Sequence, residues 1–100
     1  MPASVKAPCV YILASRKYGT LYIGATSNLI KRVWEHKNSV VAGFTKEYGI
    51  CNLVWFEQHE TMESAISREK AIKKWRRDWK LNLIELANPQ WRDLYSEIVC

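Results

Sequence analysis

Tyr11 and Tyr22 stand eleven positions apart, and each lies between apolar neighbours. The polar residues 16–20 between them include a glycine, which is typical of the turn of a β-hairpin. The two phenols are therefore predicted to lie on neighbouring strands, close enough to act on one site. The alternative for each tyrosine is an ordinary aromatic side chain of a strand.

Three further side chains extend this set. Arg32 and His36 have the i,i+4 spacing that places two side chains together on a helix, and Glu69 lies within an otherwise apolar helical stripe. A guanidinium can hold a phosphate through its forked donors, and an imidazole can carry a proton. Phenols, guanidinium, imidazole and carboxylate together are the equipment for cutting a phosphodiester with a single metal ion. An incidental pair on an exposed helix is the alternative for Arg32 and His36.

Glu69 is the most informative of these residues. Its neighbours on a helix are Ala65, Ile66 and Ile72, which are expected to face the core. A carboxylate in that position is costly to bury unless it is paired or binds a metal. It either leans outward to pair with Lys73 at i+4, or it supplies a hard oxygen ligand that, with water, suits Mg²⁺ or Mn²⁺.

The formal net charge of +5 is concentrated locally, because seven cationic residues lie between positions 68 and 80 against two acidic ones. Such clustering favours a polyanion such as nucleic acid, and a solvated helix face is the equal alternative. The side chains predicted to contact nucleic acid are Lys31, Arg68, Lys73, Lys74, Arg76 and Arg77.

The composition predicts one domain with a single core. Residues 1–8 are expected to be a disordered lead, and residues 9–100 are expected to form the domain. No apolar run approaches the roughly 18 to 20 residues that cross a bilayer, and no secretory signal is evident. The three cysteines form neither an even set nor a metal-binding pair, which predicts a reducing, cytoplasmic location.

Three short segments rich in β-branched and aromatic residues predict strands that join in one antiparallel sheet. Gly24, near the end of the second strand, indicates a close approach to the backbone by a ligand or by the next helix. The predicted strands cover residues 9–14, 20–25 and 52–58.

Helical spacing predicts a helix over residues 29–37, with cap candidates at 26–28. Its apolar stripe is expected to leave Arg32 and His36 on an adjoining face; the stripe consists of Leu29, Ile30, Val33 and Trp34. Two longer helices are predicted downstream, one capped by Thr61 and one capped by Asp78, and a short one near the C-terminus.

These motifs resemble those of the GIY-YIG nuclease domain, over about residues 9 to 86. The resemblance is to small, stand-alone bacterial members. It implies an α+β fold with a central three-stranded antiparallel β-sheet flanked by helices, and an endonuclease site that depends on a single Mg²⁺ or Mn²⁺ ion. The residues that carry it are Tyr11 in Val-Tyr-Ile, Tyr22 in Leu-Tyr-Ile-Gly, Arg32 with His36, and Glu69 in Ala-Ile-Ser-Arg-Glu-Lys.

The resemblance also implies roles for these residues. Tyr11 and Tyr22 take the places of the motif tyrosines, one of which serves as a base; because a tyrosine has a pKa of about 10, that role requires a nearby cation or metal. Arg32 takes the place of the phosphate-binding arginine, His36 matches a histidine of some branches, and Glu69 takes the place of the metal ligand.

Two positions qualify this assignment. Ala25 follows Gly24 where some members carry an active-site lysine, so the fold is a firmer expectation than activity. Asn82 lies about one helix downstream of the carboxylate, where several members place an asparagine.

The resulting expectation is a metal-dependent endonuclease in repair, recombination or processing, with DNA favoured over RNA as the substrate and the choice between them left open by the sequence. Single DNA-binding modules bury roughly 600–1,000 Å², so a domain of this size is expected to be structure-selective or weakly specific. A protein partner could add selectivity, and exposed Trp34 or Trp55 would support a weak homodimer rather than a monomer. A binding module of the same fold without turnover is the main alternative, and a protein adaptor is a third.

Overall fold

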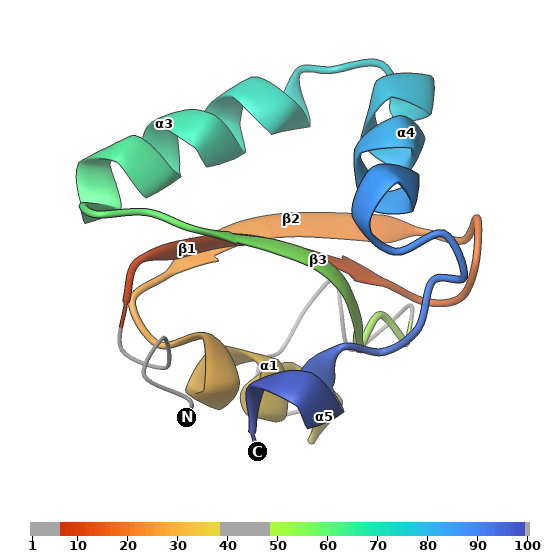
Figure 1. The fold of residues 1–100 in the computed structure, drawn as a ribbon, viewed down its shortest axis with the longest axis horizontal. Coiled ribbons are helices and arrows are strands. Elements are labelled where there is room, and N and C mark those ends of the chain that lie inside the picture. The colour runs from red at the N-terminus through yellow and green to blue at the C-terminus, as the bar shows by residue number, and fades with distance from the viewer. Residues whose placement is uncertain (1–6, 39–48, 100) are drawn as a thin grey trace.

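A three-stranded antiparallel sheet forms the centre of the computed structural model, which describes residues 7–38 and 49–99 (Figure 1). Its strand order is β2-β1-β3, so β1 is central and β2 is an edge strand. This architecture confirms the predicted α+β fold, whereas most of the predicted N-terminal lead lies outside the described residues. The strands are β1 (Cys9–Ala14), β2 (Leu21–Thr26) and β3 (Asn52–Gln58).

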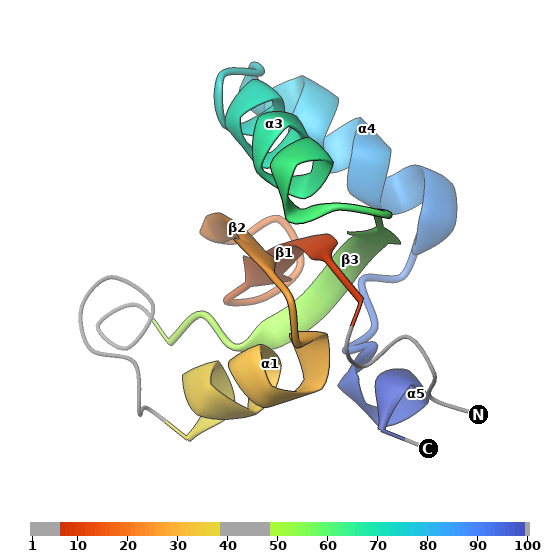
Figure 2. The same cartoon turned by 90° about the vertical axis from the view of Figure 1, so that its left-hand side faces the viewer.

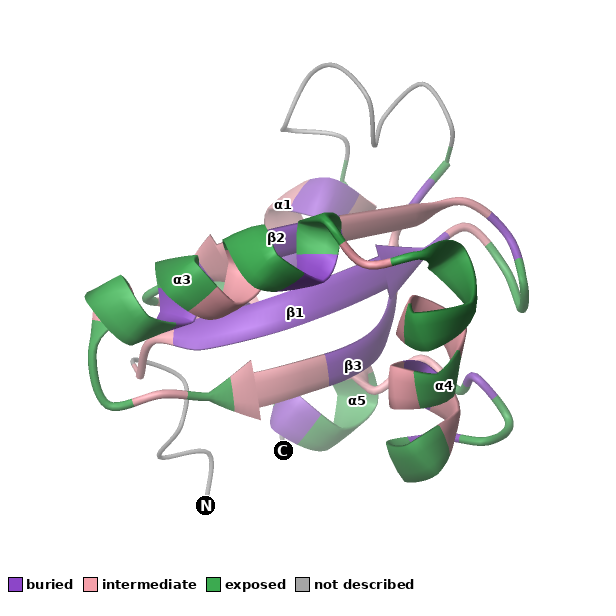
Figure 3. Cartoon of the chain, turned by 90° about the horizontal axis from the view of Figure 1, so that it is seen from above, coloured by how far each residue is buried: buried purple, intermediate pink, exposed green. Residues whose placement is uncertain are grey.

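Helices cover both faces of the sheet and make a three-layer arrangement (Figures 1 and 2). One face carries α1 and α5, and the other carries α3 and α4. Viewed from above α3 and α4, the central strand β1 is buried along its whole length (Figure 3). The helices are α1 (Leu29–Lys37), α3 (Met62–Lys73), α4 (Arg77–Ala87) and α5 (Tyr95–Ile98).

Alternation along β1 divides the core in two, because successive strand residues point to opposite faces. Tyr11 and its neighbours at i±2 pack with α1 and α5, while Val10, Ile12 and Ala14 pack with α3 and α4. Each layer therefore has its own apolar cluster, and the two clusters share only the sheet between them.

Side-chain caps fix where two of the helices begin. The Asn28 side chain accepts a hydrogen bond from the backbone N–H of Lys31 at 3.2 Å, and the Thr61 side chain accepts one from Ser64 at 3.1 Å. The predicted cap at Asp78 is wrong: α4 begins one residue before it, and Asp78 lies in the first turn. An acidic residue there still stabilises the positive end of the helix.

The predicted apolar stripe of α1 is also wrong in one respect. His36 is buried, at 5% exposure, and Trp34 is 49% exposed. Leu29, Val33 and His36 are the buried residues of α1, and their i,i+4,i+7 spacing defines the face that meets the sheet. Trp55 is likewise buried, so Trp34 remains as the exposed tryptophan of the two that the homodimer hypothesis invoked.

Arg77 has a structural role that its charge alone did not indicate. Its guanidinium donates to the carbonyl oxygens of Tyr18 and Gly19, at 2.8 and 2.6 Å, and so ties α4 to the β1–β2 turn. Tyr18 in the same turn has a positive φ of 60° and donates its hydroxyl hydrogen bond to Glu85 of α4. The turn is therefore held by two side-chain links to one helix.

We expect Arg77→Ala to lower the free energy of unfolding by about 1 kcal/mol, since both carbonyl oxygens lose their donor. Thermal denaturation measures this as a shift of about 4–8 °C for a domain of this size. Lys74→Ala is the matched control, because Lys74 is exposed and makes no ion pair within the described residues. Equal melting temperatures for the two variants would contradict the structural role of Arg77.

Candidate active site

Gly24 lets the Tyr11 side chain cross the edge strand. The two residues are directly paired between β1 and β2. A Cβ atom at Gly24 would lie 2.5 Å from the Tyr11 hydroxyl oxygen and 2.6 Å from its Cζ, which is closer than any side chain tolerates. The close approach predicted at this glycine is therefore made by Tyr11, and not by a ligand or by the next helix.

Tyr11, Tyr22 and His36 form one cluster between β1, β2 and α1. The ring centroid of Tyr22 lies 6.3 Å from that of Tyr11 and 5.3 Å from that of His36. The Tyr11 hydroxyl oxygen lies 3.5 Å from His36 Nε2. The structure thus brings together three of the five predicted catalytic side chains by direct contact.

Burial sets the protonation of this cluster. It is the largest cause that raises the pKa of Tyr11 above its ordinary value; the Tyr22 phenol and the Glu69 charge raise it further, and Arg32 opposes them. Burial also lowers the pKa of His36 below its ordinary value, and the positive charge of Arg32 lowers it further. At neutral pH the cluster therefore holds a neutral phenol next to a neutral imidazole.

His36 should make stability depend on pH. Because its pKa is lower in the folded protein, the unfolded chain takes up the proton first as the pH falls below about 6.5, and the free energy of unfolding then decreases. Denaturation midpoints measured from about pH 7.5 to about pH 5 should show this loss. His36→Gln should remove that part of the pH dependence; an unchanged profile would contradict a buried neutral imidazole.

Arg32 projects from α1 beside this cluster. Its side chain is 42% exposed and lies 3.6 Å from Glu35 in an ion pair. It borders a polar cavity of about 310 Å³, which lies at the junction of β2 and α1 and is lined by Thr26, Ser27, Asn28, Lys31, Arg32 and Glu35. Exposed cationic side chains that border a polar cavity fit a phosphate group. Neither tyrosine nor Glu69 lines this cavity, so the predicted site is not one enclosed pocket.

Glu69 approaches from the opposite layer, on α3. Its side chain is only 16% exposed and forms an ion pair of 2.6 Å with Lys73, so the outward pairing considered from the sequence is present. Its charge nevertheless acts on the Tyr11 hydroxyl, whose pKa it raises. This is possible because β2 is an edge strand against which α3 packs closely, so α1 and α3 side chains can meet around it.

The residues present fit a divalent ion held by one carboxylate. Among the described residues, no group of three or more His, Cys, Asp or Glu side chains could enclose a metal ion. Mg²⁺ commonly keeps several waters and binds through one or two carboxylates together with substrate phosphates. Glu69, whose side chain is 16% exposed and whose charge acts on Tyr11, is suited to that mode and not to a complete protein cage.

Some of the residues predicted to contact nucleic acid form ion pairs or hydrogen bonds within the protein, and others are exposed. Several are engaged by the protein itself: Lys73 with Glu69, Arg68 with Glu57 at 3.1 Å, and Arg76 with Asp78 at 3.2 Å. Arg77 is held by the turn. Lys31 and Lys74 are exposed and carry no ion pair in the described part of the chain. Asn82 lies away from the tyrosines, in a second cavity on α4.

Sequence reasoning missed the surroundings of Arg32. Glu35, Thr26 and Asn28 line the cavity beside it, and Glu35 is its ion-pair partner. The i,i+3 spacing of Arg32 and Glu35 was a signal that could have indicated this pair. The cap role of Asn28 was foreseen, but its position next to a polar cavity follows only from the chain turning between β2 and α1.

This fold and site define a nuclease domain. The family model described as the GIY-YIG catalytic domain matches residues 7–82, and the chain belongs to that family. GIY-YIG domains are nuclease domains, which act on nucleic acid and generally use divalent metal ions. No described helix is long and apolar enough to cross a membrane.

The most similar proteins include small single-domain members named UPF0213. A UPF0213 protein of Clostridium perfringens is 47% identical over 89 residues, which cover 89% of this chain and 95% of the relative. One of Staphylococcus saprophyticus is 37% identical over 75 residues, covering 75% and 90%. The solution NMR structure of a UPF0213 protein from Bacillus halodurans has a TM-score of 0.54 at 28% identity, over 86% of this chain and 90% of that one. These matches confirm the predicted resemblance and fold.

Proposed function

We propose that this protein is an endonuclease that hydrolyses phosphodiester bonds of DNA with one Mg²⁺ or Mn²⁺ ion. The observation that supports this most is the meeting of Tyr11, Tyr22 and His36 at β2, within reach of the charges of Arg32 and Glu69. These groups come from the sheet and from the helices on its two faces. Packing of an apolar core does not require their polar atoms to converge, so their convergence indicates a functional site. DNA repair, recombination or processing is the type of process that such cleavage would serve.

Each residue has a role that its surroundings allow. Arg32, beside the polar cavity, holds a phosphate and stabilises the charge that develops on it during attack. Tyr22 is half-buried and can contact water; once its hydroxyl has released its own proton to solvent, its oxygen atom receives the proton of the attacking water. Tyr11 is 2% exposed and keeps its proton, and with His36 it positions the Tyr22 ring.

Glu69 is the residue that would hold the metal ion. A bound divalent ion would polarise a phosphate oxygen and stabilise the leaving oxygen. Before binding, the carboxylate must separate from Lys73, whose ammonium group then becomes available for a phosphate. Cleavage of this kind leaves a 5′-phosphate and a 3′-hydroxyl.

Weak sequence specificity is part of the proposal. The cations around α3 and α4 contact the phosphate backbone, and backbone contacts carry no direct sequence information. Lys74 at the end of α3 and Lys31 on α1 are exposed, and neither has an ion pair within the described residues. A protein partner would be the source of any strong selectivity.

A cleavage panel tests the proposal. Labelled single-stranded, duplex, flap and junction DNA, and single-stranded RNA, are incubated with Mg²⁺, Mn²⁺ or EDTA. We expect cleavage of at least one DNA substrate with a divalent ion and none with EDTA. Activity that survives in Glu69→Ala would indicate a contaminant, and DNA binding without cleavage under every condition would favour the binding module.

A further inference from the structure

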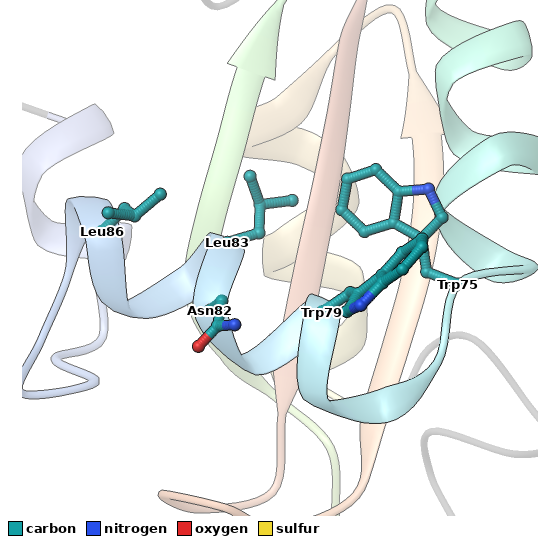
Figure 4. A pocket seen from close by; sticks show the side chains of 5 residues that line it. All are labelled: Trp75, Trp79, Asn82, Leu83 and Leu86. Carbon is teal, nitrogen blue, oxygen red and sulfur yellow. The ribbon is translucent and has the colours of Figure 1, made fainter.

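A shallow apolar groove lies along α4, on the side of the sheet opposite α1 (Figure 1). It has a volume of about 380 Å³, and its lining consists of Trp75, Trp79, Asn82, Leu83 and Leu86 (Figure 4). We refer to it as the indole groove. Trp79 is 49% exposed and Leu86 is 87% exposed, although apolar side chains of this size are normally buried. The fold therefore leaves an apolar surface with exposed aromatic groups open to a ligand.

Cationic side chains border this groove. The Arg68 guanidinium lies 5.4 Å from the ring centroid of Trp75, and that of Arg76 lies 5.2 Å from that of Trp79. The two indoles contact each other edge to face, with centroids 6.0 Å apart and planes at 76°. The Lys80 ammonium, from the residue after Trp79 in α4, donates to the Lys73 carbonyl oxygen at 3.3 Å. The groove thus combines aromatic faces with two guanidiniums, each of which also pairs with a carboxylate, Arg68 with Glu57 and Arg76 with Asp78.

We infer that the indole groove binds unpaired bases of a single-stranded nucleic-acid segment. Bases stack on aromatic side chains in proteins that bind single strands, and neighbouring cations contact the phosphates. A base in a duplex has both faces covered by its neighbours and cannot stack on Trp79. This inference rests on the proposed function for the kind of ligand, and it assigns single-stranded or locally unpaired DNA as the substrate class.

The chemistry of the groove favours this occupant over an apolar protein segment. A wholly apolar segment would gain nothing from the cationic border and would restrict the Arg68 and Arg76 side chains. A nucleotide can interact with both the indoles and the guanidiniums, since it joins a flat ring to an anionic phosphate. Asn82, in the lining, adds an amide that can donate to and accept from the edge of a base.

The groove is also close to the candidate active site along the chain. Trp75 follows Glu69 by six residues and lies in the short connection between the end of α3 and the start of α4. Arg68 and Glu69 are adjacent on α3 but make different contacts, with Glu57 of β3 and with Lys73 respectively. A strand seated in the groove would therefore pass the C-terminal end of α3 before it reaches the tyrosines.

Binding in EDTA separates this inference from cleavage. The affinity of a fluorescein-labelled oligothymidylate is measured by anisotropy for wild type, Trp79→Ala, Trp79→Phe and Trp34→Ala, beside a fully paired, blunt-ended duplex of equal length. We expect Trp79→Ala to weaken binding of the oligothymidylate about 5- to 150-fold and to leave duplex binding unchanged. Trp79→Phe should restore most of the affinity, because its ring still stacks.

Trp34→Ala is the matched control, because Trp34 has the same 49% exposure but lies on α1, across the sheet. Equal affinities of wild type and Trp79→Ala for the oligothymidylate would overturn the inference, whether or not the protein cleaves DNA. Wild-type binding that depends on Trp79, in a protein that cleaves no substrate with any metal, would support the inference and reject the proposed function. No binding of single strands even at low salt would overturn it and leave the groove to an apolar protein partner.

Discussion

Tyr22→Phe is expected to lower the cleavage rate about 10²- to 10⁴-fold, the usual contribution of a positioned general base. Tyr22 is half-buried on the edge strand, so its hydroxyl can contact the water that attacks the phosphate. The change removes one oxygen atom and leaves the ring that packs against Tyr11 and His36. Single-turnover cleavage at saturating protein measures the rate apart from binding.

Tyr11→Phe is the comparison variant for Tyr22→Phe. Tyr11 is 2% exposed, and burial raises its pKa, so its hydroxyl is a poor acceptor for a proton from water. We expect a loss of about 10-fold or less, from the missing contact with His36. A larger loss in Tyr11→Phe than in Tyr22→Phe would show that the roles of the two phenols are reversed.

Gly24→Ala is expected both to destabilise the protein and to reduce cleavage. The new methyl group would overlap the Tyr11 phenol, so either the ring or β2 must move. Overpacking of this kind costs about 1–3 kcal/mol, and displacement of catalytic groups by about 1 Å can cost about 100-fold in rate. Denaturation curves and single-turnover rates, measured at a temperature where the variant is folded, separate the two effects.

Gly49→Ala is the matched control for this substitution. Gly49 has a φ of +64°, and a Cβ atom there would meet nothing within 4 Å. Its replacement should cost about 1 kcal/mol through backbone strain alone and leave the cleavage rate of the folded protein unchanged. If Gly24→Ala behaved in the same way as Gly49→Ala, the close approach of Tyr11 would have no catalytic importance.

Local patterns in the sequence were sufficient for most of the fold. The strands and the caps at Asn28 and Thr61 depend on residues that are neighbours along the chain, so propensity and capping rules identify them. The side of α1 that is buried depends instead on what packs against it. His36 is buried beside Tyr11 and Tyr22, and this leaves Trp34 outside although it is the more apolar residue.

The candidate site was less predictable than the fold. The types of its residues were visible in the sequence, but the pairing of Tyr11 with Gly24 depends on the register of two strands. The ion pair of Glu69 with Lys73 was one of the two alternatives predicted from the sequence. That the same carboxylate also raises the pKa of Tyr11 could be found only from the three-dimensional structure. The tryptophans of the indole groove, Trp75 and Trp79, have the i,i+4 spacing of a helix, and this spacing does not distinguish buried aromatic residues from exposed ones.

The edge position of β2 affects the tendency of the protein to self-associate at high concentration. An exposed strand edge invites pairing with the edge of another molecule, and natural proteins oppose this with charged side chains. Arg32 and Glu69 come from helices on the two faces of the sheet, and both charges act on the Tyr11 hydroxyl, which lies against Gly24 of this strand. The charged groups proposed for catalysis would thus also discourage self-association through the sheet.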